Sequence, residues 1–281
     1  MRRQDSFDLH THSVRSDGHN TPSEVVALAH AEGLAGVALT DHDTGDGIAE
    51  ALAAGEELGI EVVPGTEFSA EFDGRSVHIL AYWHDHTEPE LAAELARLRD
   101  NRSDRARLMV ERFNALDVPI TFERVVEIAA GAPIGRPHLA QAVVEVGICT
   151  DEREVFDRFL ADGGPADAPK HAVDPVRAVE LLRGAGGVVV LAHPALFGRR
   201  DGGEEIPIPA LEAMIGAGLA GVEARHPAHD RAAMDRWSAL AKRYGLEITA
   251  GSDHHGGERP TPVGAAVTGR ETLERLRSLS R

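Results

Sequence analysis

The sequence is poor in cysteine, in lysine and in long apolar runs. Its 281 residues include one cysteine, Cys149, which excludes a disulfide framework and a thiolate zinc site and is most simply a buried small side chain. Lys170 and Lys242 are the only lysines, so the basic side chains are nearly all arginine. No apolar run approaches the ~20 residues that span a bilayer, and no apolar segment follows Met1 in the manner of a signal peptide. We therefore expect a cytoplasmic protein that does not associate with membranes.

Acidic side chains outnumber basic ones, and the formal net charge is −17 at pH 7. This excess argues against the binding of long duplex nucleic acid, because such binding neutralises backbone phosphates with many basic side chains. It is compatible with a small basic pocket, and some of the acids could be neutralised as metal ligands. The length accommodates one domain of the size of an α/β barrel or two smaller domains.

Strand-like apolar runs alternate with helical patterns in two parts of the chain. A helix is expected to begin at Thr21-Pro22, where Thr21 can cap it and Pro22 suits the first helical position. Buried strands are predicted at residues 36–40 and 60–63, and the alternation resumes after residue 174. This pattern predicts a parallel sheet with right-handed crossovers. Asp73-Gly74, between two alternating runs, predicts an antiparallel hairpin.

The pattern is helical throughout from residue 88 to residue 170, with a Pro/Gly-rich run at 163–169. We therefore predict an α/β domain made of residues 1–87 and 171–281, into which a small helical domain of residues 88–170 is inserted. A polar, Gly/Pro-rich loop at 199–209 could serve as a lid.

Residue types that bind metals follow the predicted strands along the chain. His10 and His12 stand two apart on an extended segment, so both rings point the same way and can reach one ion. His42, Glu67 and Asp253 each come within a few residues of the end of a later strand. Because the carboxyl ends of parallel strands converge in barrel-like folds, we expect these side chains to meet in one pocket.

The candidate ligands are six histidines and three carboxylates: His10, His12, His42, His78, His193, His255, Asp17, Glu67 and Asp253. A catalytic zinc ion typically takes three protein ligands and a water, so this supply predicts two or three ions, with Glu67 as a bridge. Imidazole and carboxylate ligands suit Zn²⁺, Mn²⁺ and Fe²⁺. Paired ions polarise a phosphoryl oxygen and lower the pKa of a bridging water toward ~7. Phosphoester hydrolysis is therefore the expected reaction.

Seven segments resemble, in the same order, the metal motifs of the PHP (polymerase and histidinol phosphatase) family: His10-Thr11-His12, Ser16-Asp17-Gly18, Thr40-Asp41-His42, Gly65-Thr66-Glu67, His78, His193-Pro194 and Ser252-Asp253-His254-His255. The resemblance covers nearly the whole chain. It implies a distorted (β/α)7 barrel that holds three Mn²⁺, Fe²⁺ or Zn²⁺ ions, at which a hydroxide bridging the ions attacks phosphorus. The ligand sets that it implies are His10, His12, Glu67 and Asp253 for one ion, Glu67, His78 and His193 for a second, and Asp17, His42 and His255 for the third.

The predicted insert contains Gly135-Arg136-Pro137-His138, which is similar to a segment that bacterial nucleoside 3′,5′-bisphosphate phosphatases and related 5′→3′ oligonucleotide exonucleases of this family place over the metals. Arg136 and His138 near a helix start suit a phosphate, although exposed side chains beside a helix-starting proline remain the simpler alternative. The expected substrate is a small nucleotide: a nucleoside 3′,5′-bisphosphate, a 5′-nucleotide, or the 5′ end of a short single-stranded RNA or DNA.

Several residues beside the expected ligands have roles that stay open. Asp41 could orient the His42 ring, which we favour, or donate a proton. His226 is our candidate for protonating the leaving oxygen. Arg225 stands where the family commonly has an aromatic residue, and its guanidinium could stack on a nucleobase instead. His254 is expected to be a bystander, although an exchange of roles with His255 is open.

Three other functions compete with nucleotide hydrolysis. The first is histidinol-phosphate hydrolysis, against which the Gly-Arg-Pro-His segment argues. The second is amide or lactone hydrolysis by the same ions. The third is a non-catalytic, metal-stabilised module, against which the complete set of nine candidate ligands argues.

Overall fold

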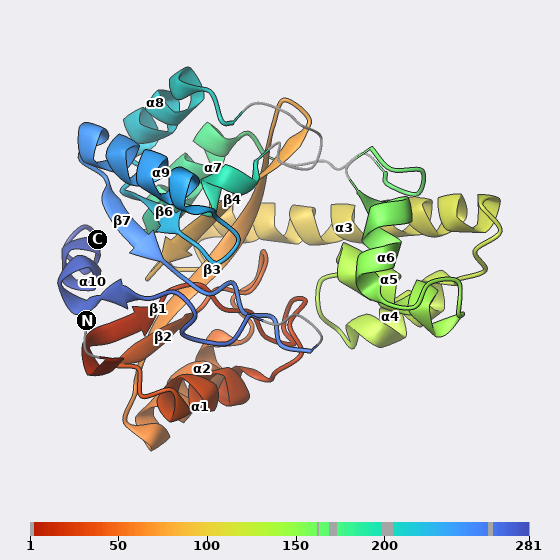
Figure 1. The fold of residues 1–281 in the computed structure, drawn as a ribbon, viewed down its shortest axis with the longest axis horizontal. Coiled ribbons are helices and arrows are strands. Elements are labelled where there is room, and N and C mark those ends of the chain that lie inside the picture. Colours follow the sequence, from red (N-terminus) through yellow and green to blue (C-terminus); the bar gives the residue numbers. More distant parts are fainter. Residues whose placement is uncertain (1–2, 162, 169–172, 198–204, 258–260, 281) are drawn as a thin grey trace. The chain divides into compact units, whose positions relative to one another are not determined.

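The computed structural model describes residues 3–161, 163–168, 173–197, 205–257 and 261–280 (Figure 1). The chain divides into two compact units, one formed by Met1–Ala92 with Val173–Arg281 and the other by Ala93–Ala172. Part of the loop predicted as a lid, residues 199–204, lies outside the described residues, as do residues 169 and 170 at the end of the predicted insert.

The larger unit is built on an eight-stranded sheet with the order β7-β6-β5-β4-β3-β2-β1-β8. The strands are β1 (Ser6–Asp8), β2 (Gly36–Leu39), β3 (Glu61–Phe72), β4 (Arg75–Tyr82), β5 (Val188–Leu191), β6 (Gly221–Arg225), β7 (Glu247–Ala250) and β8 (Thr268–Gly269). Neighbouring strands run parallel except where β4 lies between β3 and β5 and where β8 lies beside β1. The predicted parallel sheet is thus confirmed, with one reversed strand inside it.

The reversed strand β4 results from the hairpin predicted at Asp73-Gly74. Both turn residues have positive φ, 50° for Asp73 and 74° for Gly74. Two such residues make the tight turn whose twist matches that of paired antiparallel strands. The hairpin is confirmed by eight paired positions, from Gly65 opposite Tyr82 to Phe72 opposite Arg75.

The sheet curves so that the segments that follow β1 and β7 meet. Beyond the last residues of β1 and β7, Thr11 forms a parallel bridge with His254. The His12 amide donates to the His254 carbonyl at 2.9 Å, and the Asp253 amide donates to the His10 carbonyl at 2.9 Å. The sheet is therefore a nearly closed barrel, and the expected distorted α/β barrel is confirmed.

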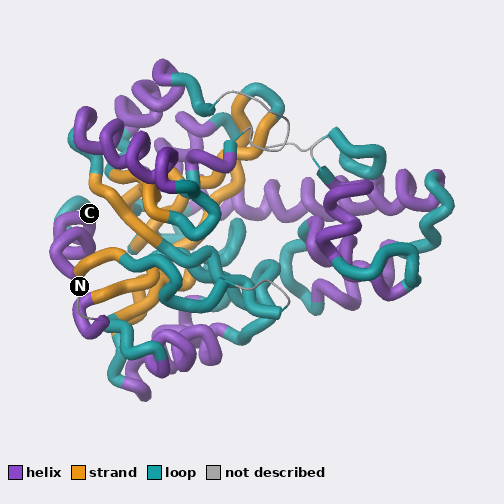
Figure 2. Tube along the Cα trace, viewed as in Figure 1, coloured by secondary structure: helices purple, strands orange, loops and turns teal. Residues whose placement is uncertain are grey.

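Helices lie on the outside of this barrel (Figure 2). They are α1 (Pro22–Ala31), α2 (Ile48–Leu58), α7 (Pro175–Gly184), α8 (Ile208–Ala217), α9 (Arg231–Tyr244) and α10 (Arg270–Arg277). Helix α1 begins as the sequence predicts: Thr21 accepts from the Glu24 amide while the Glu24 side chain accepts from the Thr21 amide. Among the described helices, none combines the length and apolar character that a membrane span requires.

Apolar side chains fill the barrel and the layer between strands and helices. Phe7, Leu9, Leu80 and Tyr82 are fully buried in one of these clusters. A Cβ on Gly36 would lie 2.5 Å from the Phe7 ring and 2.5 Å from the Glu61 carbonyl, so only glycine permits the close approach of β1, β2 and β3 at that point.

The smaller unit is helical. Helix α3 (Pro89–Ala115) begins in the larger unit and continues through the smaller one, which also holds α4 (Phe122–Ala129), α5 (Arg136–Glu145), α6 (Glu152–Val155) and a π-helical turn at Phe156–Leu160. Its own core contains Phe113, Leu139, Val155 and Leu160, and Cys149 is buried in the same cluster.

Candidate metal centre and active site

The nine candidate ligands all come from the larger unit. His10, His12 and Asp17 follow β1, His42 follows β2, His193 follows β5, and Asp253 and His255 follow β7. Glu67 lies within the long strand β3 and His78 within β4. Seven of the nine side chains thus follow the carboxyl ends of parallel strands, where active sites of such folds lie.

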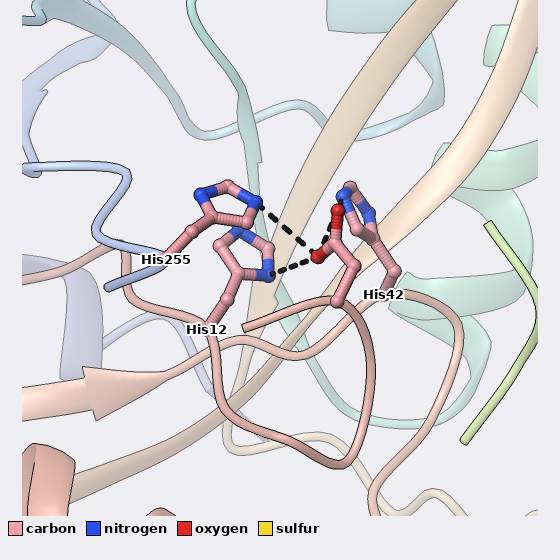
Figure 3. Close-up of side chains that lie close together, drawn as sticks. His12, His42 and His255 are labelled. Carbon is pink, nitrogen blue, oxygen red and sulfur yellow. Dashed lines mark ion pairs between the residues drawn. The ribbon is translucent and has the colours of Figure 1, made fainter. Parts of the chain in front are cut away.

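The side chains form three overlapping groups in which one atom from each member lies within 4.8 Å of the others. The groups are His12, Asp17, His42 and His255; His10, His12, Glu67 and Asp253; and His42, Glu67 and His78. In the first group, Asp17 Oδ1 is 3.2 Å from His255 Nε2 and 3.9 Å from His12 Nδ1 and His42 Nε2. Figure 3 shows the three imidazoles turned toward this carboxylate.

Glu67 stands between the other two groups and is 1% exposed. Its Oε2 lies 3.1 Å from His10 Nε2, 3.0 Å from His12 Nε2 and 3.3 Å from His42 Nδ1. Its Oε1 lies 2.8 Å from His78 Nδ1 and 3.0 Å from His193 Nε2. Each carboxylate oxygen therefore faces a separate set of imidazoles, which is the arrangement that a bridging ligand requires. His193 is outside the three groups but shares the Oε1 side of Glu67 with His78.

The donor atoms fit divalent cations. His10 Nε2, both ring nitrogens of His12 and His42 Nδ1 are buried and make no well-aligned hydrogen bond to any described residue. Buried polar atoms without partners are rare and destabilising, unless a bound ion or water satisfies them. Imidazole nitrogens and carboxylate oxygens are the ligand types that Zn²⁺, Mn²⁺ and Fe²⁺ accept.

Electrostatics in the cluster favour a cation as well. Burial opposes ionisation of Glu67, but the charge on the His10 ring holds the pKa of this carboxyl well below its usual value. Burial, with the His12 and His78 rings adding to it, lowers the pKa of His42 to about 3 despite the nearby acids Glu67 and Asp17, so that the His42 ring is neutral and can offer a lone pair. Burial opposes the charge on His12 too, yet Asp253 and Glu67 raise the pKa of His12 to about 10. A cation that binds here replaces such protons as the counter-charge of the acids.

Asp41 supports the loop that carries Asp17. Its carboxylate is 2% exposed and accepts hydrogen bonds from the Ser13 amide at 2.7 Å, from the Ser13 hydroxyl at 2.6 Å and from the Ser16 hydroxyl at 2.6 Å. Among the described contacts, none joins this carboxylate to the His42 ring. The contacts therefore favour a role in holding the loop over orienting His42 or donating a proton.

His226 is buried beside Asp253, a member of one candidate metal group. Its Nδ1 accepts a hydrogen bond from the Ala228 amide at 3.1 Å, so the neutral ring carries its proton on Nε2. That Nε2 lies 3.4 Å from Asp253 Oδ2. The ring thus presents an N–H toward the candidate site.

Arg225, at the end of β6, is exposed. His254 contacts Asn20 and Thr261, whereas His255 belongs to the group around Asp17.

Arg136 and His138 lie in the smaller unit, at the first turn of α5. The Gly135 amide donates to His138 Nδ1 at 3.0 Å, and Arg136 donates to the Leu160 carbonyl at 3.1 Å. Two further arginines, Arg102 and Arg105, lie nearby. A guanidinium nitrogen of Arg102 is 3.9 Å from the point where a Cβ on Gly135 would stand. Burial lowers the pKa of Arg105, and the charges of Arg136 and Arg102 lower it further.

Sequence reasoning did not find Arg102, Arg105 or the buried acid Glu223. Glu223 lies in β6 and contacts the His10 ring. A signal for it was present, because an acid within the apolar run Gly221-Val222-Glu223-Ala224 must find a polar partner once the strand is buried. The two arginines lie on the long helix α3, and the sequence around them resembles any solvated helix face.

A buried cluster of imidazoles and carboxylates at the carboxyl ends of barrel strands defines a metal-dependent hydrolase. The sequence of this chain matches the family model of the PHP domain over residues 8–116. The 3′,5′-nucleoside bisphosphate phosphatase of Chromobacterium violaceum is 36% identical over 261 residues, covering 92% of this chain and 90% of that protein. A 5′-3′ exoribonuclease of Haemophilus influenzae is 32% identical over 249 residues, covering 89% of both chains. A phosphoribosyl 1,2-cyclic phosphate 1,2-diphosphodiesterase of Eggerthella lenta is 35% identical over 253 residues, covering 89% of this chain and 94% of that protein.

The fold is shared over the same length. The crystal structure of an inferred metal-dependent phosphoesterase from Bifidobacterium adolescentis superposes with a TM-score of 0.92 at 34% identity, covering 98% of this chain and 96% of that one. This chain therefore belongs to the PHP family, as its motifs indicate. It is an enzyme of that family, a metal-dependent hydrolase of phosphoric esters, and the expected reaction class is confirmed.

Proposed function

We propose that this enzyme hydrolyses small nucleotides that carry a 5′-phosphate and a second phosphate on the 3′ side, either a nucleoside 3′,5′-bisphosphate or the 5′ end of a short single-stranded oligonucleotide. One relative is named for a nucleoside that carries phosphates at its 3′ and 5′ positions, and another is named for degrading RNA in the 5′→3′ direction, where each internal nucleotide carries a phosphate on its 3′ side. The net charge of −17 disfavours long duplexes, since an extended phosphate backbone needs many basic partners.

The observation that carries the proposal is the position of Glu67 between two sets of imidazoles. We assign the nine candidate ligands to three divalent ions, each of them Mn²⁺, Fe²⁺ or Zn²⁺. When bound, such ions polarise the phosphoryl group, activate water and spread the negative charge of the transition state. His10, His12, Glu67 and Asp253 would hold one ion, Asp17, His42 and His255 another, and Glu67, His78 and His193 the third.

The remaining site residues would act on the substrate directly. His226 carries a proton on Nε2 beside Asp253, so it can donate to the leaving oxygen. Arg225 is exposed at the end of its strand and can stack on a base. Arg136 and His138 would bind the phosphate that is not cleaved. Support comes from the positive charge of Arg102, Arg105 and Arg136 in the smaller unit, because an anion there relieves repulsion between guanidinium groups.

A hydrolysis screen with added Mn²⁺ tests the proposal, with inorganic phosphate, free mononucleotide or free amine measured as each substrate requires. Its substrates are adenosine 3′,5′-bisphosphate, AMP, a short 5′-phosphorylated RNA, histidinol phosphate and a simple amide. We expect phosphate release from the bisphosphate and mononucleotide release from the RNA to exceed hydrolysis of the other three. A preference for histidinol phosphate, or amide hydrolysis without phosphate release, would contradict the nucleotide assignment.

The substitution Arg136→Ala tests the second-phosphate contact. A charge-assisted hydrogen bond contributes ~1.5–3 kcal/mol, so bisphosphate hydrolysis should fall by about 10- to 100-fold while hydrolysis of an aryl phosphate falls much less. Arg124→Ala is the matched control, because Arg124 lies in the same unit and pairs with Glu145 on the surface. Equal loss on the bisphosphate and on the aryl phosphate would contradict the contact.

A further inference from the structure

Glu223 is a buried acid that belongs to none of the three candidate metal groups. It lies in the middle of β6 between Val222 and Ala224 and is 0% exposed. Its Oε1 and Oε2 lie 3.1 and 3.2 Å from His10 Nδ1. Its Oε2 also accepts a hydrogen bond from the His193 amide at 2.9 Å. One carboxylate on β6 therefore contacts the segment after β1 and the segment after β5.

The contact determines which nitrogen of His10 carries the proton. An ionised carboxylate only accepts hydrogen bonds, so the ring nitrogen that faces it, Nδ1, must donate. The other nitrogen, Nε2, then keeps its lone pair. This Nε2 faces Glu67 Oε2 at 3.1 Å and Asp253 Oδ1 at 3.5 Å, within the group that would hold an ion. A carboxylate behind a ligating imidazole fixes both the tautomer and the orientation of the ring.

The side chains of His10 and Glu223 pack against the backbone of Gly251. A Cβ at this position would lie 2.2 Å from His10 Cβ and 2.8 Å from Glu223 Oε1, so that no larger residue fits. His193, whose amide donates to Glu223, has φ of +21°, which is unusual for a residue other than glycine. The hydrogen bond from its amide to Glu223 helps to hold the chain in this conformation.

We propose that Glu223 is a positioning residue of the metal centre, which fixes His10 as the Nδ1-protonated tautomer and fixes the main chain of His193 at the same time. The inference rests on the metal centre of the proposed function and adds a residue outside its nine ligands. Removal of the Glu223 charge weakens metal binding although every ligand is still present.

Glutamine cannot replace Glu223, even though it has the same shape. Both carboxylate oxygens lie near His10 Nδ1, and Oε2 also accepts from the His193 amide, whereas glutamine has one acceptor oxygen. With the amide nitrogen at the Oε1 position, the oxygen keeps the His193 contact, but an N–H group then lies 3.1 Å from His10 Nδ1 and favours the ring that carries its proton on Nε2, which cannot bind a cation. With the amide nitrogen facing His193, two N–H groups oppose each other at the 2.9 Å position of the present hydrogen bond.

Zinc titration of the metal-free enzyme with a competing chelator tests the inference. Glu223→Gln should weaken the binding of one or more zinc ions by about 10- to 100-fold, the range found when such partners of metal ligands are removed. Glu247→Gln is the matched control, because Glu247 on the neighbouring strand β7 is paired with Gly221 of β6 and forms an ion pair with Arg275. Unchanged zinc affinity of folded Glu223→Gln would overturn the inference.

A spectroscopic measurement tests the tautomer in the unaltered protein. Long-range ¹H–¹⁵N spectra of the zinc-loaded enzyme should show the His10 ring protonated at Nδ1, and spectra of metal-free Glu223→Gln should show the proton moved to Nε2. A His10 ring that carries no proton on Nδ1 in the zinc-loaded wild-type enzyme would overturn the inference even if the variant failed to fold.

These results are separable from those of the proposed function. Zinc binding that depends on Glu223 in an enzyme that releases no phosphate from nucleotides supports the inference and contradicts the substrate assignment. Normal nucleotide hydrolysis and normal zinc affinity in Glu223→Gln overturn the inference and leave the substrate assignment intact.

Discussion

Replacement of Glu67 by glutamine should remove two ions and not one. The two carboxylate oxygens face different imidazoles: Oε2 lies within 3.3 Å of ring nitrogens of His10, His12 and His42, and Oε1 within 3.0 Å of His78 and His193. Glutamine keeps the volume but removes the charge and one acceptor. Both ion positions that use Glu67 should therefore weaken together.

The size of the effect follows from the burial of this carboxylate, which is 1% exposed. Removal of one partner from a buried charged pair generally costs about 3–5 kcal/mol. At about 1.4 kcal/mol per factor of ten, the affinity for each ion should fall by roughly 10²- to 10⁴-fold. Such a loss empties a site that is otherwise filled at micromolar metal, and phosphate release should fall below detection.

The measurement is metal content per chain by elemental analysis after gel filtration over a weak chelator. We expect Glu67→Gln to retain one ion where the unaltered enzyme holds three, and Asp17→Asn to retain two, because Asp17 belongs to one group alone. Glu61→Gln is the control on the same strand, since Glu61 pairs with Arg270 and Arg277. Loss of a single ion in both Glu67→Gln and Asp17→Asn would refute the bridging role.

Three further results are expected. His226→Asn should lower nucleotide turnover by about 10²- to 10⁴-fold. Aryl phosphate turnover should fall far less, because an aryl oxide is a good leaving group and needs no proton donor. Equal losses on the two substrates would contradict proton donation from Nε2. Asp41→Asn removes the charge and replaces one of the two acceptor oxygens by an NH₂ group, which weakens the hydrogen bonds from Ser13 and Ser16. Urea unfolding should therefore show a loss of about 1–3 kcal/mol, and the ion at Asp17 should bind more weakly. Unchanged stability would show that the loop does not depend on these bonds. Removal of the ions by a chelator, starting from free metal at about 100 times Kd, should lower the free energy of unfolding by about 2.7 kcal/mol per independent site. The midpoint of thermal unfolding should fall by several degrees. A midpoint that does not move would show that metal does not stabilise the native state.

The sequence predicted the barrel well because two kinds of local signal agree with the tertiary structure. Apolar runs alternate with capped helices, and the Thr21–Glu24 capping box forms as its residues predict. The hairpin at Asp73-Gly74 also depends on local backbone preferences alone, since both residues tolerate positive φ. Most of the candidate ligands were visible because they follow the ends of predicted strands, whereas Glu67 and His78 lie within β3 and β4.

Residues that act through contacts between distant segments were not predictable in the same way. Asp41 immediately precedes His42 in sequence, yet its carboxylate binds the hydroxyls of Ser13 and Ser16 from another loop. Glu223 lies 213 positions from His10 along the chain, and only the pairing of strands brings the two together. No local pattern encodes such a contact, because it depends on the order of strands in the sheet.

The bridge between Thr11 and His254 has a consequence for biosynthesis. The segments that it joins carry His10 and His12 on one side and Asp253 and His255 on the other, so ligands from the two ends of the polypeptide meet only after the final strands have been translated and released. A nascent chain on the ribosome lacks a complete set for two of the three groups until that moment. Loading of ions at these two groups must follow the synthesis of Asp253 and His255, whereas the His42–Glu67–His78 group needs no residue beyond 78.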